Sequence, residues 1–145
     1  MDSQLIAQKS PKTTTYLAWI IVVLAIFSCS SRADYNLLIG FLILFLRSQY
    51  ANDKYKMFTK VVLHTIILSL LFDFIWIWQY SSYWQHGEET SDLWKSLSVV
   101  HNLAYYFGII ESLLKLPIIL FLYKKFNNLG GNNKELFSFN YSTPK

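Results

Sequence analysis

Three charged residues lie inside the longest apolar stretches of this sequence. Asp73 lies within the run 60–80, and Glu111 and Lys115 lie within the run 99–123. On a helix, Glu111 and Lys115 are spaced i and i+4, so they face each other on one flank. Ionisable groups in apolar surroundings are costly unless they are paired. The sequence therefore predicts a buried charge cluster of Asp73, Glu111 and Lys115.

Two kinds of chemistry fit this cluster. Two carboxylates against one ammonium leave an excess of negative charge, so the cluster fits a proton or ion site in which one carboxylate holds a proton. The same residues also fit a structural ion pair that joins two helices. We favour the structural interpretation, because one acid without a chain of further acids makes a poor proton relay.

Motifs for catalysis and metal binding are absent from the sequence. It contains neither GxSxG nor HExxH, and it has no Cys–His pair in a local catalytic context. His64 has no second ligand at a spacing that suits a metal ion. The single Cys29 excludes an internal disulfide. We therefore expect no enzymatic activity, cofactor, metal or small-molecule substrate.

Small residues recur every four positions in the run 99–123, at Ala104, Gly108 and Ser112. Small side chains at this spacing let two helix backbones approach closely. This pattern predicts a helix-packing face and does not suggest a pore.

The composition of the chain is that of a membrane protein. Hydrophobic residues make up 53% of the sequence and charged residues 15%, which leaves too little polar surface to cover a soluble core. The apolar runs predict an all-α transmembrane bundle that forms a single membrane domain over 1–145. Its four spans lie at about 16–31, 33–49, 58–80 and 99–123. A polar N-tail, 1–15, and an irregular polar C-tail, 127–145, flank the spans.

The first two spans have alternatives. The run 16–31 follows a basic tail and ends in small residues, which also fits a signal peptide, although we favour a span. The central run of the second span, 35–46, covers about 18 Å as a helix, whereas a bilayer core needs about 30 Å. This segment either borrows flanking residues to cross fully or lies partly within the bundle.

Basic residues are distributed unevenly around the four spans. The N-tail, the loop 47–60 and the residues after the fourth span, 124–145, share one side and hold ten Lys and Arg residues, against two on the other side. This bias places both termini on the cytosolic or matrix side. Aromatic residues then mark the opposite membrane interface, where amphipathic rings settle: Trp76, Trp78, Tyr80, Tyr83 and Trp84.

Three stretches resemble the angiotensin II receptor-associated protein family. They are SSRADYNLLIGFLILFLRSQYANDKYKMF, FTKVVLHTIILSLLFDFIWI with Asp73, and ESLLKLPIILFLYKKFNNLGG with Lys115. The resemblance implies a non-enzymatic membrane adaptor that binds a receptor through a cytosolic C-tail and alters its trafficking. The chain departs from the family in its longer loop 81–98 and its much shorter C-tail.

We expect the protein to act through contacts with other integral membrane proteins and with lipids. The leading expectation is a structural accessory subunit of a larger membrane complex, and an adaptor for receptor trafficking is the alternative. A third hypothesis is a small proton or ion conductor that uses the charge cluster. Both the mitochondrial inner membrane and an endomembrane fit the sequence. Nucleic acid is not an expected partner, because most basic residues lie beside apolar runs.

Overall fold

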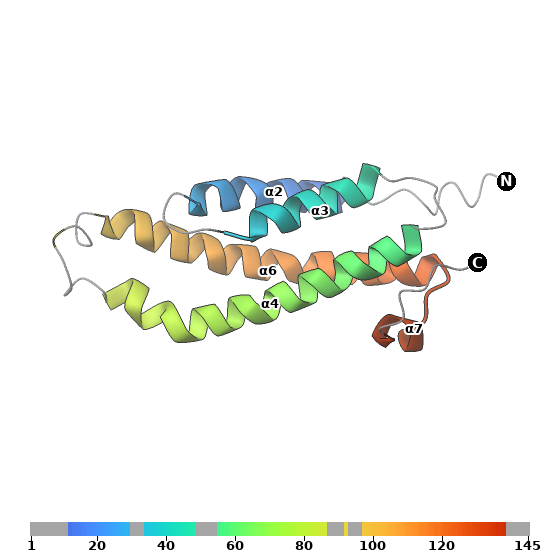
Figure 1. The fold of residues 1–145 in the computed structure, drawn as a ribbon. Helices are drawn as coiled ribbons and strands as arrows, with labels where there is room; N and C mark the ends of the chain where they lie inside the picture. Colours follow the sequence, from blue (N-terminus) through green and yellow to red (C-terminus); the bar gives the residue numbers. More distant parts are fainter. Residues whose placement is uncertain (1–11, 30–33, 49–54, 87–91, 93–96, 139–145) are drawn as a thin grey trace.

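The computed structural model describes residues 12–29, 34–48, 55–86, 92 and 97–138, and these are almost entirely helical (Figure 1). The predicted all-α fold is confirmed for this part of the chain. Its helices are α2 (Lys12–Ser28), α3 (Asn36–Ser48), α4 (Tyr55–His86), α6 (Ser98–Asn128) and α7 (Asn133–Phe137).

The four longer helices run alternately in opposite directions and close into a bundle (Figure 1). Helix α2 packs on α3 and α6, and α4 packs on α6 and α3. The backbones of α2 and α3 come close at Gly40, where a Cβ atom would lie 2.5 Å from Cγ2 of Val22. Glycine is therefore required at this crossing, and α2 and α3 form a tight antiparallel pair.

Two helices are long and apolar enough to cross a membrane, namely the segment Tyr55–Gln79 of α4 and the whole of α6. Helices α2 and α3 are apolar but shorter, with 17 and 13 residues. Helix α3 therefore extends about 20 Å at about 1.5 Å per residue. By length and composition, the described helices include two candidate membrane spans and two shorter apolar helices.

The long helices extend beyond the predicted spans. Helix α4 begins at Tyr55 and continues to His86, so parts of the predicted loops 47–60 and 81–98 are helical. No Gly or Pro interrupts 55–86, and without these breakers the helix continues into polar residues. Helix α6 continues to Asn128 and ends before Gly130, whose φ of 77° is left-handed and typical of a helix stop.

The C-terminal region differs from the predicted irregular tail, 127–145, because it contains α7. The side chain of Asn132 caps this helix by accepting a hydrogen bond from the Glu135 backbone N–H at 2.7 Å. Leu136 is buried in the hydrophobic core, and Lys56 of α4 forms an ion pair with Glu135 at 2.7 Å. So short a helix has no periodic signal and depends on such tertiary contacts. Residues 139–145 lie outside the described part of the chain.

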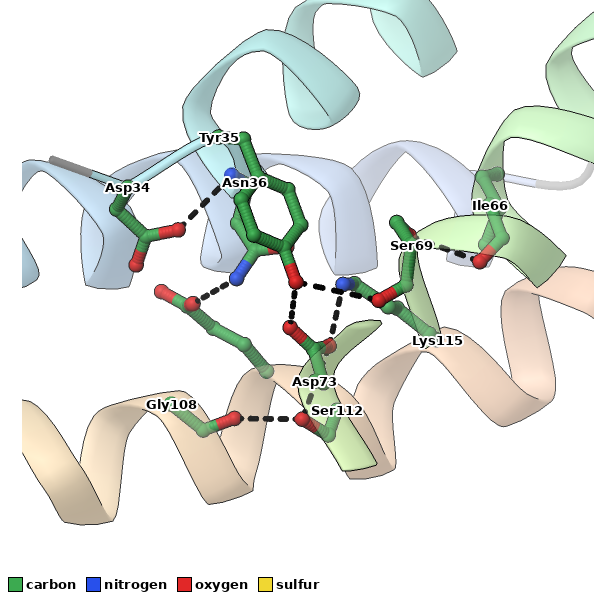
Figure 2. A network of polar contacts seen from close by, with 10 residues as sticks. Asp34, Tyr35, Asn36, Ile66, Ser69, Asp73, Gly108, Ser112 and Lys115 are labelled. Carbon is green, nitrogen blue, oxygen red and sulfur yellow. Dashed lines mark hydrogen bonds and ion pairs between the residues drawn. The ribbon is translucent and has the colours of Figure 1, made fainter. Parts of the chain in front are cut away.

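Apolar side chains cover much of the outside of the bundle. Each of the four longer helices exposes large hydrophobic residues, among them Trp19, Phe41, Phe72 and Leu120. The interior combines an aliphatic core with buried charged residues, and Asp73, Glu111 and Lys115 are among them. The polar interior lies near the start of α3, where α3, α4 and α6 meet (Figure 2).

Candidate functional site

The carboxylate of Asp73 is the centre of the buried polar network (Figure 2). Its Oδ1 accepts a hydrogen bond from the Tyr35 hydroxyl. Its Oδ2 accepts hydrogen bonds from Ser112 Oγ at 3.0 Å and from Lys115 Nζ at 2.5 Å. Since Tyr35 immediately precedes α3, while Ser112 and Lys115 belong to α6, this one carboxylate of α4 joins three helices.

Lys115 is fully buried and forms an ion pair with Asp73. Its Nζ also lies 5.2 Å from the centre of the Tyr35 ring, a distance that suits a cation–π contact. Lys115 is therefore held by an ion pair with Asp73 of α4 and by the ring of Tyr35 at the start of α3.

A second set of contacts links the start of α3 to α6. Asn36 Nδ2 donates a hydrogen bond to Oε2 of Glu111 at 2.7 Å. The backbone N–H of Asn36 donates to Oδ1 of Asp34 at 2.9 Å. This contact, from an Asp side chain to the N–H two residues on, is typical of an Asx turn and starts α3. Asp34 therefore orients the segment that carries Tyr35 and Asn36 into the interior.

The structure brings together all three members of the predicted charge cluster, but Glu111 has a different partner from the other two. Asp73 forms the ion pair with Lys115 across two helices, and Glu111 receives the amide hydrogen bond from Asn36. Sequence reasoning missed Asp34, Tyr35 and Asn36. The signal that points to them is a run of three polar or amphipathic residues at the start of an apolar segment, and these residues fall within the predicted second span, 33–49.

Ala104, Gly108 and Ser112 are all buried within the bundle. Ser112 Oγ lies 2.8 Å from the Gly108 carbonyl oxygen as well as 3.0 Å from Asp73. The small-residue face of α6 is therefore turned towards the other helices of this chain, and it is not an outer surface.

The predicted interface aromatics are only partly described. Trp76 is half-buried, and its ring centroid lies 6.1 Å from that of Tyr105. Trp78 is 86% exposed. Tyr80, Tyr83 and Trp84 belong to α4, and their side chains lie outside the described part of the chain.

An open apolar groove of about 590 Å³ lies between α3 and α4. Its walls include Leu38 and Leu42 of α3 and Leu68 and Phe72 of α4, and Tyr35 lines it beside the buried network. The groove hydroxyls turn towards their own helix, since Thr65 donates to the Val61 carbonyl at 3.0 Å and Ser69 to the Ile66 carbonyl at 2.8 Å. The groove therefore presents mainly hydrocarbon to whatever occupies it.

The described residues show no group of three or more His, Cys, Asp and Glu side chains arranged to hold a metal ion. Half-buried His64 places its Nδ1 2.9 Å from the Lys60 carbonyl oxygen of its own helix. The chemistry that this site supports is the pairing of charges and hydrogen bonds between helices.

Comparisons with models of protein families, with curated proteins and with solved structures find no match to this chain. The resemblance to the angiotensin II receptor-associated protein family stays a prediction from the sequence.

Proposed function

We propose that this chain is a multi-pass membrane protein whose four longer helices all cross the bilayer. On this proposal both termini face the cytosol or matrix. The supporting observation is the distribution of polarity: large apolar side chains cover the exterior, while Asp73, Glu111 and Lys115 lie inside. Lipid is a good solvent for such an exterior, and ionisable groups within a bilayer turn towards the bundle interior. The short helices α2 and α3 cross by local thinning of the bilayer.

Within the membrane, the chain acts as a structural accessory subunit that binds other integral membrane proteins. The observation that carries this proposal is the apolar groove between α3 and α4. Leu38, Leu68 and Phe72 of the groove are all at least half exposed. An apolar helix of a partner protein would fill this groove by van der Waals packing, which drives helix association in lipid.

The buried network supports a structural role more than ion conduction. Asp73 is held by Tyr35, Ser112 and Lys115 at once, so that moving a proton through it would break a shared set of bonds. A proton leak in reconstituted liposomes that Asp73→Asn abolishes would favour conduction instead. The packing of α7 onto α4 likewise favours a subunit over an adaptor that binds through a free tail.

Site-specific photo-crosslinking in native membranes tests the proposal. A photoreactive amino acid at Leu68 lies in the groove, and one at Leu120 on the outer side of α6 is the matched control, since both positions are exposed and apolar. We expect Leu68 to form a discrete protein adduct and Leu120 to form lipid adducts. Lipid adducts alone at both positions, together with a monomer after extraction in mild detergent, would contradict a subunit role.

A further inference from the structure

We infer that α7 and the adjacent end of α6 form a binding site for the headgroup of an anionic phospholipid. This inference rests on the proposed membrane insertion, but not on the proposed protein partner. The site consists of Lys124, Lys134 and Lys56 as its cations, with Phe137 beside them.

The fold brings these residues together from three helices. The hydroxyl of Tyr123 in α6 donates to Oδ1 of Asn133 in α7 at 2.7 Å. Lys124 and Lys134 directly follow these two bonded residues in the sequence, and both are exposed. This hydrogen bond ties α7 to the end of α6, so two exposed cationic side chains, one from each helix, lie at the same end of the bundle.

Lys56 of α4 contacts both α7 and the turn that precedes it. Its Nζ forms an ion pair with Glu135 at 2.7 Å and donates to the Gly130 carbonyl oxygen at 3.0 Å. The pair is partly exposed, with about a third of each side chain accessible (30% for Lys56 and 39% for Glu135). Among the described residues of α7, Glu135 is thus the one carboxylate that competes with a headgroup phosphate for Lys56.

Further contacts hold α7 in place independently of these cations. Lys60 Nζ donates to the backbone oxygen of Ser138 at 2.5 Å, and Leu136 is buried. Between these two anchors, Phe137 is 74% exposed. An aromatic ring beside exposed lysines favours a bilayer surface as the occupant, because the ring enters the interface while the ammonium groups meet phosphate.

The charge at this end of the bundle complements an anionic leaflet. Figure 1 shows α7 beside the start of α4 and the end of α6. The described residues there include the accessible Lys56, Lys124 and Lys134 and the buried Lys60 and Lys125, with Glu135 as the acid. Juxtamembrane clusters of four to eight basic residues are typical of sites for anionic lipids. The hydrogen bond between Tyr123 and Asn133 holds α7 against the end of α6, which localises the exposed Lys124 and Lys134 at this end of the bundle.

Lipid selectivity of the reconstituted full chain tests the inference. The protein is placed in phosphatidylcholine bilayers, and the motionally restricted fraction of spin-labelled phosphatidylserine is compared with that of spin-labelled phosphatidylcholine. We expect a preference for phosphatidylserine that falls about fivefold for each of Lys124→Gln and Lys134→Gln. Glu135→Gln removes the competing charge and is expected to raise the preference.

Lys12→Gln is the matched control, because Lys12 is an exposed lysine in the first turn of α2. An equal loss of preference in Lys12→Gln would show a diffuse charge effect and overturn the site. An unchanged preference in the Lys124→Gln/Lys134→Gln double variant would also overturn it. Insertion without lipid preference contradicts only this inference, whereas a chain that stays outside the bilayer contradicts the proposed function as well.

Discussion

Lys115 of α6 and Asp73 of α4 form a buried ion pair, with 2.5 Å between Nζ and Oδ2, although 42 residues separate them in the sequence. Lys115 is fully buried and Asp73 is 5% exposed. Removing water from two charges is costly, and the pair compensates for that cost only when further hydrogen bonds support it. Tyr35 and Ser112 supply those bonds here.

The first prediction concerns this pair. Asp73→Ala should destabilise the protein by about 3–5 kcal/mol, because it leaves Lys115 buried without its counter-ion. Lys115→Met in the Asp73→Ala background should recover much of that loss, since an apolar pair of similar volume is nearly neutral. Denaturant unfolding of the single and double variants in detergent measures the coupling. Strictly additive losses would show that the two residues do not interact.

The Tyr35 hydroxyl provides a second test. Tyr35→Phe keeps the ring over Lys115 and removes one donor to Asp73. A hydrogen bond to a charged group contributes about 1.5–3 kcal/mol, so the free energy of unfolding should fall by about this amount. Tyr16→Phe, at an exposed position of α2, is the control and should change stability little. Equal losses of stability in both variants would show that the hydrogen bond from Tyr35 to Asp73 does not stabilise the protein.

Glu111 connects α6 to the start of α3 through Asn36. In Glu111→Gln the side-chain oxygen still accepts the Asn36 hydrogen bond, so we expect only a small change in stability. In Glu111→Leu the buried Asn36 amide loses this acceptor, which costs about 1–3 kcal/mol. Thermal unfolding of both variants in detergent distinguishes them. A loss in the Gln variant as large as that in the Leu variant would mean that the charge of Glu111, and not its hydrogen bond, matters.

The contact between α2 and α3 gives a steric prediction. Gly40→Ala places a methyl group 2.5 Å from Cγ2 of Val22, and overpacking of this kind typically costs about 1–3 kcal/mol. Val22→Ala in the same chain removes the clashing atom and should restore part of the stability. Unfolding midpoints of the single and double variants test this. A double variant that is less stable than Gly40→Ala would contradict the assigned contact.

Much of the helical architecture follows from local sequence. The run around Asp73 is apolar and free of Gly and Pro over more than 20 residues. The run around Lys115 contains Gly108 and Pro117, and both runs are helices in the structure. Gly130 follows the second long helix and adopts the left-handed φ that ends it. The excess of apolar over charged residues likewise predicted that ionisable groups inside the runs would need partners.

The partners themselves were decided by tertiary structure. The i, i+4 spacing of Glu111 and Lys115 describes one helix surface, but the rotation of α4 against α6 places Asp73 on Lys115. The Asx turn at Asp34 then directs Tyr35 to Asp73 and Asn36 to Glu111. Such pairings depend on helix rotation and crossing, which no local pattern encodes.

Helix α7 likewise depends on tertiary contacts and not on local sequence. Its five residues have too little length for a periodic pattern, and a helix of one turn is unstable alone. The buried Leu136 and the ion pair between Lys56 and Glu135 stabilise it through contacts with other helices of the bundle. From the sequence alone one can therefore derive which segments are apolar helices and that their charges must be paired. The packed bundle decides which charges pair, because burial against a neighbour is a property of two segments and not of one.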